Sequence, residues 1–501
     1  MKVKDRLDFW LSKVTMYRLV TLCLVTLLSI SGLLTLTGYF AFSLLALALS
    51  VTVLLVAVYG SGRLFGWIFG VRPHGESSII TALILACLFV PPELTLLAFA
   101  KLALIGVFAS TTKYLVAVRG RHIFNPAAAA VVLASVTGIG FAQWWIATPA
   151  LLPIVGVIGL LILQKTRTAV VSGVFVAVAA TLVTIQSVFS GLEIWQGIWL
   201  AFASWPILFF GAIMVSEPLT QPPRRWQQLV IAIGVALLMF VPLHTEFIEM
   251  TPALALIIGN AAAWWWGARR GLKLKFVEKI QLTPTSYEFV FAGTVPFTAG
   301  QYLEFSLPHR ADSRGIRRVF TIATNPADAN VRFGIKFYDR PSTFKQTLRD
   351  LKPGTVVPAT RVAGDFVLPT DSREPMLLIA GGIGITPFIS FARHLIKTNQ
   401  KREVILVYAV ASAEEIAYKD ILEKSGMQII IVVPGGKADV SKTWKVIDAP
   451  FVSIELLEKE ITNITMRTVY ISGAPLMVNA VTRAVKKLGA KRIKTDHFTG
   501  Y

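Results

Sequence analysis

The sequence predicts a polytopic α-helical membrane domain followed by a small antiparallel β-barrel and a doubly wound α/β domain. Three observations predict this fold class. The 501-residue chain is 54% hydrophobic with a mean hydropathy of +0.63, which is too apolar for a purely soluble protein. Long apolar runs crowd into the part before Trp266, and charged residues return from Arg269 onward. In that second part, short alternating strands give way to strands that alternate with helices.

The first part contains apolar runs of a length suited to crossing a bilayer, separated by short loops. The loops expected on one side carry pairs of Lys and Arg, and those on the other side carry only Glu as charged residues. This asymmetry predicts a multi-pass protein of the cytoplasmic membrane, with both termini and the soluble part in the cytoplasm. The first run lacks a cleavage site, so we interpret it as an uncleaved helix. We expect about ten spans, some of them broken, at residues 17–36, 42–59, 77–91, 95–112, 125–139, 149–164, 169–188, 194–214, 228–243 and 252–267.

Two of these runs, 77–91 and 125–139, are short and begin with polar residues or proline. Half-helices of this kind are tolerated within a bilayer where they line a buried site, and their N-termini favour anionic groups. Short tilted spans are the alternative interpretation. Lys101 lies inside an apolar run, where it either faces a ligand or extends toward the interface. The candidate membrane site for an acceptor or flavin consists of Ser78, Thr81, Lys101, Asn125, Pro126 and Glu217.

Four motifs of the first part occur in the order found in a known family. They lie at residues 77–85, 113–114, 121–128 and 214–220. On these motifs, most of residues 15–267 resembles the B subunit of sodium-translocating NADH:quinone reductase and the D subunit of the Rnf complex. The resemblance implies a flavin among the half-helices and reduction of quinone. The Ser-Gly-Ala-Thr segment to which that family attaches FMN is missing here, so we expect any FMN or riboflavin to be noncovalent.

Other redox groups and partners have little support in the sequence. Cys23 and Cys87 both lie in apolar runs and provide no disulfide framework, zinc site or iron–sulfur cluster. His74, His122 and His244 lie at the ends of spans and form no facing pair of the kind that haem needs. We interpret His122 as a capping or interfacial residue and expect no haem and no metal. The net charge of +20 follows the membrane loops, so we expect no nucleic-acid partner.

Residues 272–370 contain short strands separated by turn residues, which is typical of a small antiparallel barrel. From Glu374 onward, strands alternate with helices and predict a parallel doubly wound sheet. Barrel strands are expected at 274–277, 287–291, 302–306, 319–323 and 331–337, and sheet strands at 376–380, 404–408, 428–432 and 468–472. The predicted domains are 1–270, 271–370 and 371–501.

The strand at 376–380 is followed by Gly381, Gly382 and Gly384, and a helix-like stretch begins at Thr386-Pro387. Glycine lets the backbone approach an anion closely, and the N–H groups at a helix start favour negative charge. The pattern indicates a site for a dinucleotide pyrophosphate. A tight turn without a ligand is the alternative.

Six motifs of the second part, at 300–302, 318–321, 342–354, 381–387, 472–478 and 496–501, occur in the order found in the ferredoxin–NADP⁺ reductase superfamily, which this part resembles. The resemblance implies FAD in the barrel and a nicotinamide nucleotide on the sheet. The implied FAD-binding residues are Tyr302, Arg318, Phe320, Thr321, Lys336, Ser342, Thr343 and Tyr501. The implied NAD-binding residues are Gly381, Gly382, Gly384, Thr386, Pro387, Gly473, Pro475 and Met477. The implied catalytic residues are Thr321, Thr386 and Asp496.

Three positions depart from the pattern of that superfamily. Ser472 and Ala474 replace its usual Cys and Pro, so no thiol is expected beside the nicotinamide. Ala411 stands where NADPH-selective relatives commonly place an Arg against the 2′-phosphate. Without that cation the 2′-phosphate loses a charge-assisted pair of roughly 1.5–3 kcal/mol. We therefore expect NADH to be preferred over NADPH, unless Lys419 or another base replaces the Arg.

Together these patterns predict a membrane-bound oxidoreductase that passes electrons from NADH through FAD to an acceptor in the membrane half. Quinone is the leading acceptor because it resides in the bilayer, and a second flavin would serve as a relay. One alternative is a redox-driven sodium or proton pump, although Glu217 is nearly alone as an acid in the spans. The other is a reductase with a membrane anchor that serves a different acceptor. The sequence leaves the acceptor, the membrane flavin, ion translocation and oligomeric state open.

Overall fold

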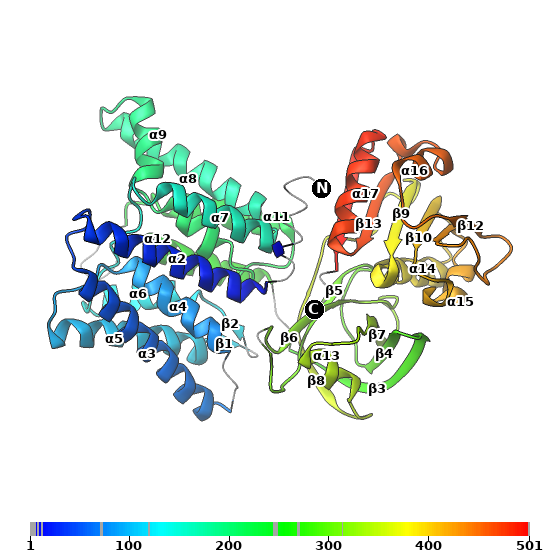
Figure 1. Cartoon of the computed structure of the whole chain (residues 1–501), viewed down its shortest axis with the longest axis horizontal. Coiled ribbons are helices and arrows are strands. Elements are labelled where there is room, and N and C mark those ends of the chain that lie inside the picture. The colour runs from blue at the N-terminus through cyan, green and yellow to red at the C-terminus, as the bar shows by residue number, and fades with distance from the viewer. Residues whose placement is uncertain are drawn as a thin grey trace. The chain divides into compact units, whose positions relative to one another are not determined.

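The computed structural model describes residue 7 and residues 10–11, 14–70, 74–118, 121–243, 249–267, 271–312 and 314–498. The chain divides into two compact units: residues 13–269 form one, and residues 270–501 with residues 1–12 form the other. We call the first the helical unit and the second, after the superfamily that its motifs resemble, the reductase unit; Figure 1 shows the two six-stranded sheets in the second. Each is described by itself.

The helical unit is built from apolar helices joined by short loops. Its elements are α2 (Met16–Leu36), α3 (Leu44–Ile68), α4 (Gly75–Leu88), α5 (Leu96–Leu115), β1 (Ala117–Val118), β2 (Arg121–His122), α6 (Pro126–Val136), α7 (Leu152–Thr166), α8 (Ala169–Phe189), α9 (Ile194–Ala203), α10 (Ile207–Phe209), the π-helix η1 (Phe210–Val215), α11 (Arg225–Leu238) and α12 (Pro252–Trp266). Side-chain caps start several of them: the hydroxyls of Ser43, Thr95 and Thr251 accept from backbone N–H groups in the first turns of α3, α5 and α12.

Helix occurs within each of the ten predicted spans, but fewer helices have the length of a full crossing. Among the described residues, four helices are long and apolar enough to cross a membrane, namely α2, α3, α5 and α8. A fifth crossing results if α9 is combined with α10 and η1, which follow it after a bend of 57°. The short helices include α4 and α6, with 14 and 11 residues, where about 20 residues span the hydrocarbon core. Four to five such helices are compatible with a membrane-anchored protein, and the count of about ten crossings stays a prediction.

The reductase unit begins with a six-stranded antiparallel sheet in the order β6-β5-β8-β3-β4-β7. All five strands expected here form, and β8 joins them between β5 and β3. The bounds are β3 (Leu272–Thr283), β4 (Ser286–Ala292), β5 (Tyr302–Ser306), β6 (Arg317–Thr321), β7 (Asn330–Lys336) and β8 (Val356–Ala363), with α13 (Thr343–Arg349) between β7 and β8. Its core is rich in phenylalanine, and Phe289, Phe291 and Phe333 are fully buried.

A six-stranded parallel sheet follows, in the order β12-β11-β10-β9-β13-β14. Its strands are β9 (Met376–Gly381), β10 (Val404–Ala409), β11 (Gln428–Val433), β12 (Lys445–Asp448), β13 (Thr468–Gly473) and β14 (Arg492–His497), and its helices are α14 (Thr386–Thr398), α15 (Lys419–Lys424), α16 (Ile454–Glu460) and α17 (Pro475–Lys487). Alternate residues of β9 enter two cores: Leu378 packs with α14 and α15, and Leu377 with α16 and α17.

The strand order reverses beside β9. From β9 the chain adds β10, β11 and β12 on one side, and β13 and β14 then lie on the other. Ligands of open α/β sheets bind outside the carboxyl ends of the strands at such a switch point. The glycine turn after β9 lies at this point.

Candidate functional site

The glycines around the switch point have two different roles. A Cβ on Gly384 would lie 2.5 Å from the carbonyl oxygen of Ser472, and a Cβ on Gly381 would lie 3.3 Å from the sulfur of Met477. Gly473 packs against the same sulfur, since its Cβ would lie 3.2 Å away. These glycines therefore let the ends of β9 and β13 approach each other.

Gly382 is different because its surroundings are open. Its φ is +53°, and a Cβ there would meet no atom within 4 Å. The 3₁₀ turn η2 (Gly382–Ile385) leads from it directly into α14, where Pro387 lies in the first turn. The hydroxyl of buried Thr386 donates to the carbonyl of Ile383 at 3.1 Å and fixes this turn. Gly382 is thus the position at which an anion can approach the backbone.

Two hydroxyl residues meet at one end of the antiparallel sheet. Tyr302 of β5 pairs with Thr321 of β6, and the ring of Tyr302 lies 3.2 Å from the position of a Cβ on Gly364. Burial raises the pKa of Tyr302, the charge of Arg361 opposes this, and the charge of Asp496 raises the pKa further. The structure therefore brings Tyr302, Thr321 and the edge of the parallel sheet together.

Asp496 lies on β14, opposite Ser472 of β13. Burial raises its pKa to about 6, and a hydrogen bond from the backbone of His497 opposes the rise. Ser472 is fully buried, and its hydroxyl has no hydrogen-bond partner among the described residues. A carboxyl group with a raised pKa and an unsatisfied hydroxyl thus lie near the carboxyl ends of the neighbouring strands β14 and β13.

A cluster of cations lies at the start of α13. The guanidinium of buried Arg318 donates to the carbonyls of Arg314 and Arg317 at 2.8 and 2.6 Å, and it lies 5.4 Å from the ring of Phe344. Burial, together with the charges of Arg318 and Arg314, lowers the pKa of Lys345 to about 8. The carboxylate of Asp312 lies 3.8 Å from the guanidinium of Arg318 and offsets part of the positive charge. The remaining positive charge would favour a bound anion.

Sequence reasoning did not identify Lys345. The sequence did contain a sign of its role, because Lys345 lies in the first turn of the helix that Ser342 caps, next to the predicted residues Ser342 and Thr343. The hydroxyl of Ser342 accepts from the backbone N–H of Lys345 at 3.4 Å, and that of Thr343 accepts from the backbone of Asp312 at 3.0 Å.

The remaining predicted residues of the reductase unit occupy varied positions. Phe320 packs its ring 6.0 Å from those of Phe305 and Phe344 and so covers the barrel core. The ammonium of Lys336 donates to Glu415 at 2.8 Å, and its backbone carbonyl accepts from the ammonium of Lys345 at 2.9 Å. Pro475 begins α17. Tyr501 lies outside the described residues.

The helical unit contains a hollow at the starts of its short helices α4 and α6. The space in it that a water-sized sphere can reach measures about 80 Å³, and the whole hollow with the solvent at its mouth about 740 Å³. The lining residues are Met16, Tyr17, Val20, Ser77, Ile80, Thr81, Ile84, His122, Asn125, Pro126, Ala127, Ile162, Thr166, Ile213, Ser216, Glu217, Pro218 and Leu219. We call this hollow the polar cavity, because a hydrogen-bonded cluster closes one side of it.

Glu217 is the centre of that cluster. One carboxylate oxygen lies 3.3 Å from Nε2 of His122, and the other accepts from the side-chain amide of Asn125 at 2.9 Å. Asn125 also caps α6 by accepting from Ala128, and its own backbone N–H donates to Asn260 of α12 at 2.9 Å. The π-helix η1 ends just before Glu217, and such irregular turns are frequent at functional sites.

Of the six predicted membrane-site residues, the structure brings Thr81, Asn125, Pro126 and Glu217 to the polar cavity. Ser78 is buried against α3 instead, where its hydroxyl would lie 3.3 Å from a Cβ on Gly62. Lys101 is exposed on α5 and does not line the cavity.

Two cavity residues escaped the sequence analysis. His122, interpreted there as a capping residue, faces Glu217. Ser77 accepts a hydrogen bond of 2.7 Å from the ammonium of Lys113, which lies in one of the motifs.

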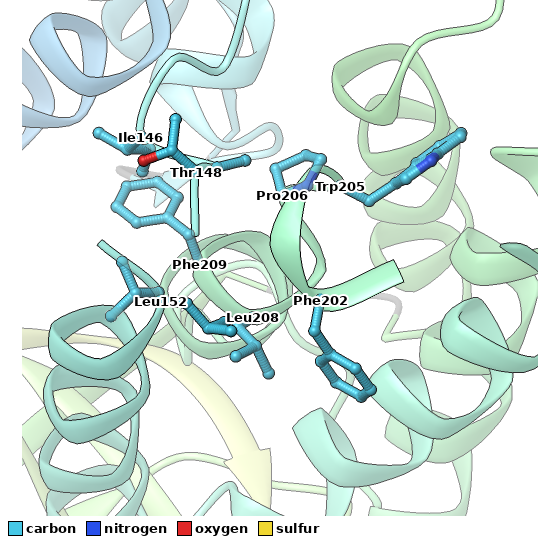
Figure 2. Close-up of a pocket in the computed structure, with 10 residues that line it drawn as sticks. Ile146, Thr148, Leu152, Phe202, Trp205, Pro206, Leu208 and Phe209 are labelled. Atoms are coloured by element: carbon cyan, nitrogen blue, oxygen red, sulfur yellow. The ribbon is translucent and has the colours of Figure 1, made fainter. Parts of the chain in front are cut away.

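A second hollow lies at the bend between α9 and α10, where Figure 2 shows Trp205 and Pro206. Its volume is about 10 Å³, and most of the side chains around it, such as Leu152 and Phe209, are apolar. This is about the space of one water molecule, so it does not fit a cofactor. Among the described residues, no group of three or more His, Cys, Asp or Glu is placed to hold a metal ion.

Comparisons with known proteins concern the reductase unit. Residues 378–483 match the family described as the oxidoreductase NAD-binding domain. The flavohemoprotein of Bacillus thuringiensis subsp. konkukian is 33% identical over 132 residues, which cover 25% of this chain and 33% of that protein. The ferredoxin–NAD(P)(+) reductase component of the naphthalene 1,2-dioxygenase system of Pseudomonas putida is 24% identical over 200 residues, or 38% of this chain and 57% of that protein.

A solved structure, the FAD/NAD-binding domain of nitric oxide dioxygenase from Vibrio cholerae, aligns with a TM-score of 0.39 and 20% identity over 46% of this chain and 99% of that domain. The chain spans between a third and somewhat over half of the length of the two curated relatives. The reductase unit is therefore related to flavohemoproteins and ferredoxin reductases, and it carries their kind of NAD-binding domain.

Proposed function

We propose that this protein is a membrane-bound flavoprotein reductase that passes electrons from NADH through FAD to a quinone bound in the helical unit. The observation that carries the proposal is the presence, in one chain, of an oxidoreductase NAD-binding domain and a polar cavity formed where two broken helices begin. The first provides a donor site, and the second provides a place for an acceptor.

The residues at the switch point suit a dinucleotide. The open backbone at Gly382 and the start of α14 would receive the pyrophosphate. A buried hydroxyl without a partner costs roughly 1–3 kcal/mol, so a ligand atom that satisfies Ser472 would bind favourably. Both features belong to the end of the sheet where β9 and β13 are neighbours.

The proposed preference for NADH rests on the absence of a suitable cation after β10. Ala411 is exposed and cannot pair with a 2′-phosphate. Lys419, the base that could replace an arginine, donates its ammonium to the carbonyl of Asp439 at 2.8 Å.

FAD fits the antiparallel sheet of the reductase unit. Arg318 and Lys345 would hold its phosphates, and Tyr302 and Thr321 would border its ring. When bound, FAD supplies the chemistry that accepts a hydride and releases electrons one at a time. The chain's own residues contribute position and charge. A noncovalent FMN or riboflavin in the helical unit is the relay between FAD and the quinone that the resemblance of this unit implies.

The experiment uses full-length protein in lipid nanodiscs, supplied with NADH and a short-chain quinone and no other protein. We expect NADH oxidation and quinol formation in equal amounts, and extraction should release FAD. The variants Asn125→Ala and Glu217→Ala should lose quinone reduction but keep ferricyanide reduction, which needs the reductase unit alone. Reduction of ferricyanide but not quinone by the unmodified protein would identify the helical unit as an anchor.

A further inference from the structure

The polar cavity contains an acid–base pair in addition to space for an acceptor. His122 is 7% exposed, and its Nε2 lies 3.3 Å from one carboxylate oxygen of Glu217. The other oxygen is held by Asn125 at 2.9 Å. The carboxylate is therefore fixed from two sides, and it in turn orients the imidazole ring.

Among the titratable side chains around the cavity, His122 is the one whose chemistry best suits it to donate a proton near neutral pH. Among the described lining residues, the titratable side chains are Tyr17 of α2, His122 of β2 and Glu217 after η1. Lys113 of α5 reaches the rim through Ser77 of α4, while α7 contributes uncharged residues. Imidazole is the side chain that ordinarily exchanges its proton between pH 5 and 8.

The dimensions determine how a ring-shaped acceptor can use this space. The space inside the hollow, about 80 Å³, is smaller than the cavity of about 150 Å³ known to admit benzene. A ring-shaped acceptor therefore extends into the mouth of the hollow, with an edge available to the lining side chains.

We propose that His122, oriented by Glu217, donates a proton to the carbonyl oxygen of the acceptor as that acceptor is reduced. This inference rests on the proposed function, the reduction of quinone by NADH. The carboxylate of Glu217 lies against the imidazole ring and fixes its orientation in the cavity. His122 is thus a catalytic residue, and Glu217 and Asn125 are positioning residues.

The proton transfer balances in the following way. NADH is oxidised to NAD⁺ and provides two electrons, and its hydrogen leaves to water as a proton. The quinone gains two electrons and two protons. For each proton delivered, the N–H bond of the imidazolium breaks as an O–H bond forms on a quinone oxygen, and the neutral imidazole then regains a proton from water. The sum is NADH, quinone and one proton giving NAD⁺ and quinol.

The test compares full-length variants in nanodiscs from about pH 5.5 to 8.5, on both sides of the ordinary imidazole pKa. At each pH, the rate of quinone reduction is divided by the rate of ferricyanide reduction. The pH dependence of the reductase unit, which affects both rates, then cancels from the ratio. In unmodified protein this ratio should fall as pH rises and the imidazole loses its proton. His122→Gln should lower the ratio by about 100-fold or more and abolish its pH dependence. Glu217→Gln should lower the ratio by less than His122→Gln and keep its pH dependence, because the ring is held less firmly but still carries its proton.

Two controls separate chemistry from folding. Glu93→Gln removes an exposed carboxylate outside the cavity, and its pH profile should match that of unmodified protein. Added imidazole should restore part of the rate of His122→Ala, which a purely structural role does not predict. A reduced ratio with an unchanged pH profile in His122→Gln, or full activity of that variant, would overturn the inference alone. Failure of unmodified protein to reduce quinone at any pH would overturn the proposed function and this inference together.

Discussion

The two central glycines of the switch point should respond differently to a single added methyl group. At Gly384 the new Cβ would lie 2.5 Å from the carbonyl oxygen of Ser472 and 2.7 Å from Cα of Gly473. Both are backbone atoms that cannot rotate away. At Gly382 the new Cβ would meet nothing within 4 Å, although the φ of +53° is unfavourable for alanine. The first change therefore damages packing, and the second changes the surface that a ligand meets.

The expected magnitudes are distinct. Overpacking typically costs about 1–3 kcal/mol, which for a unit of this size lowers Tm by roughly 2–12 °C in Gly384→Ala. A left-handed alanine costs about 1–2 kcal/mol, so the Tm of Gly382→Ala should fall by roughly 2–8 °C. That variant should in addition lose a charge-assisted backbone contact of about 1.5–3 kcal/mol to the pyrophosphate. The KM for NADH should therefore rise by about 10- to 100-fold.

The assay is NADH:ferricyanide reduction by full-length protein, together with thermal unfolding. Gly382→Asn is the control for strain, because asparagine tolerates positive φ but keeps the Cβ. It should recover stability without recovering the KM. An unchanged KM in Gly382→Ala would show that no phosphate approaches this turn. Undiminished stability in Gly384→Ala would contradict the close packing of β9 and β13.

Three further predictions concern the cofactor, the nucleotide and pH. Arg318→Ala and Lys345→Met should each purify with less bound FAD by absorbance, because the anion loses a cation, and full flavin content in both would remove the cluster from the FAD site. Ala411→Arg should raise kcat/KM for NADPH by about 10- to 100-fold and leave NADH nearly unchanged, and no gain would place the 2′-phosphate elsewhere. Burial raises the pKa of Asp496 to about 6 in the folded protein, so its favourable contribution is complete below the unfolded pKa of about 3.9 and is lost as pH rises through 6. Asp496→Asn should therefore exceed the unmodified protein in stability by up to about 3 kcal/mol at pH 8 and by less at pH 5, and equal pH profiles in thermal melts would refute the shift.

Apolar patterning was sufficient to predict the central strands but not the edges of the sheets. The run at 376–380 could be recognised because both faces of β9 are buried. β12 and β14 were not predicted as strands, because Lys445 and Arg492 begin short, polar edge segments that lack this pattern. β8 was missed for a related reason, since its exposed residues and Pro358 interrupt the apolar sequence.

The helical unit shows why the sequence could not predict which way each helix faces. α5 is apolar nearly all around, so no periodic pattern indicates which way Lys101 points, and the structure exposes it. The position of Asn125 was easier to predict. A cap residue followed by proline marks the start of a helix, and the side chain of the cap residue lies at that start. The contact of His122 with Glu217 joins residues 95 positions apart, which local sequence cannot predict.

Gly384 illustrates a different limit of sequence reasoning. The motif alone indicates that each glycine of the turn allows a ligand to approach, and a bulky residue at 384 would then block the pyrophosphate. The structure assigns that position to contact between strand ends and leaves Gly382 facing open space. A glycine motif therefore predicts where a turn lies, while the neighbouring strand decides which glycine is free to face the ligand.

The starts of α4 and α6 differ in a way that bears on the orientation of any acceptor. Asn125 caps α6 with its own side chain, whereas His74 at the corresponding position of α4 makes no side-chain cap hydrogen bond. The first turn of α4 is half-buried and contains Glu76, whose acid provides part of the negative charge that a helix start favours. Ser77, which lines the cavity from the same turn, is held by the ammonium of Lys113. The positive charge of Lys113 favours an electron-rich atom on the α4 side of the polar cavity, and the His122–Glu217 side supplies the proton of the proposed transfer. A quinone, with an oxygen at each end of its ring, is chemically suited to both.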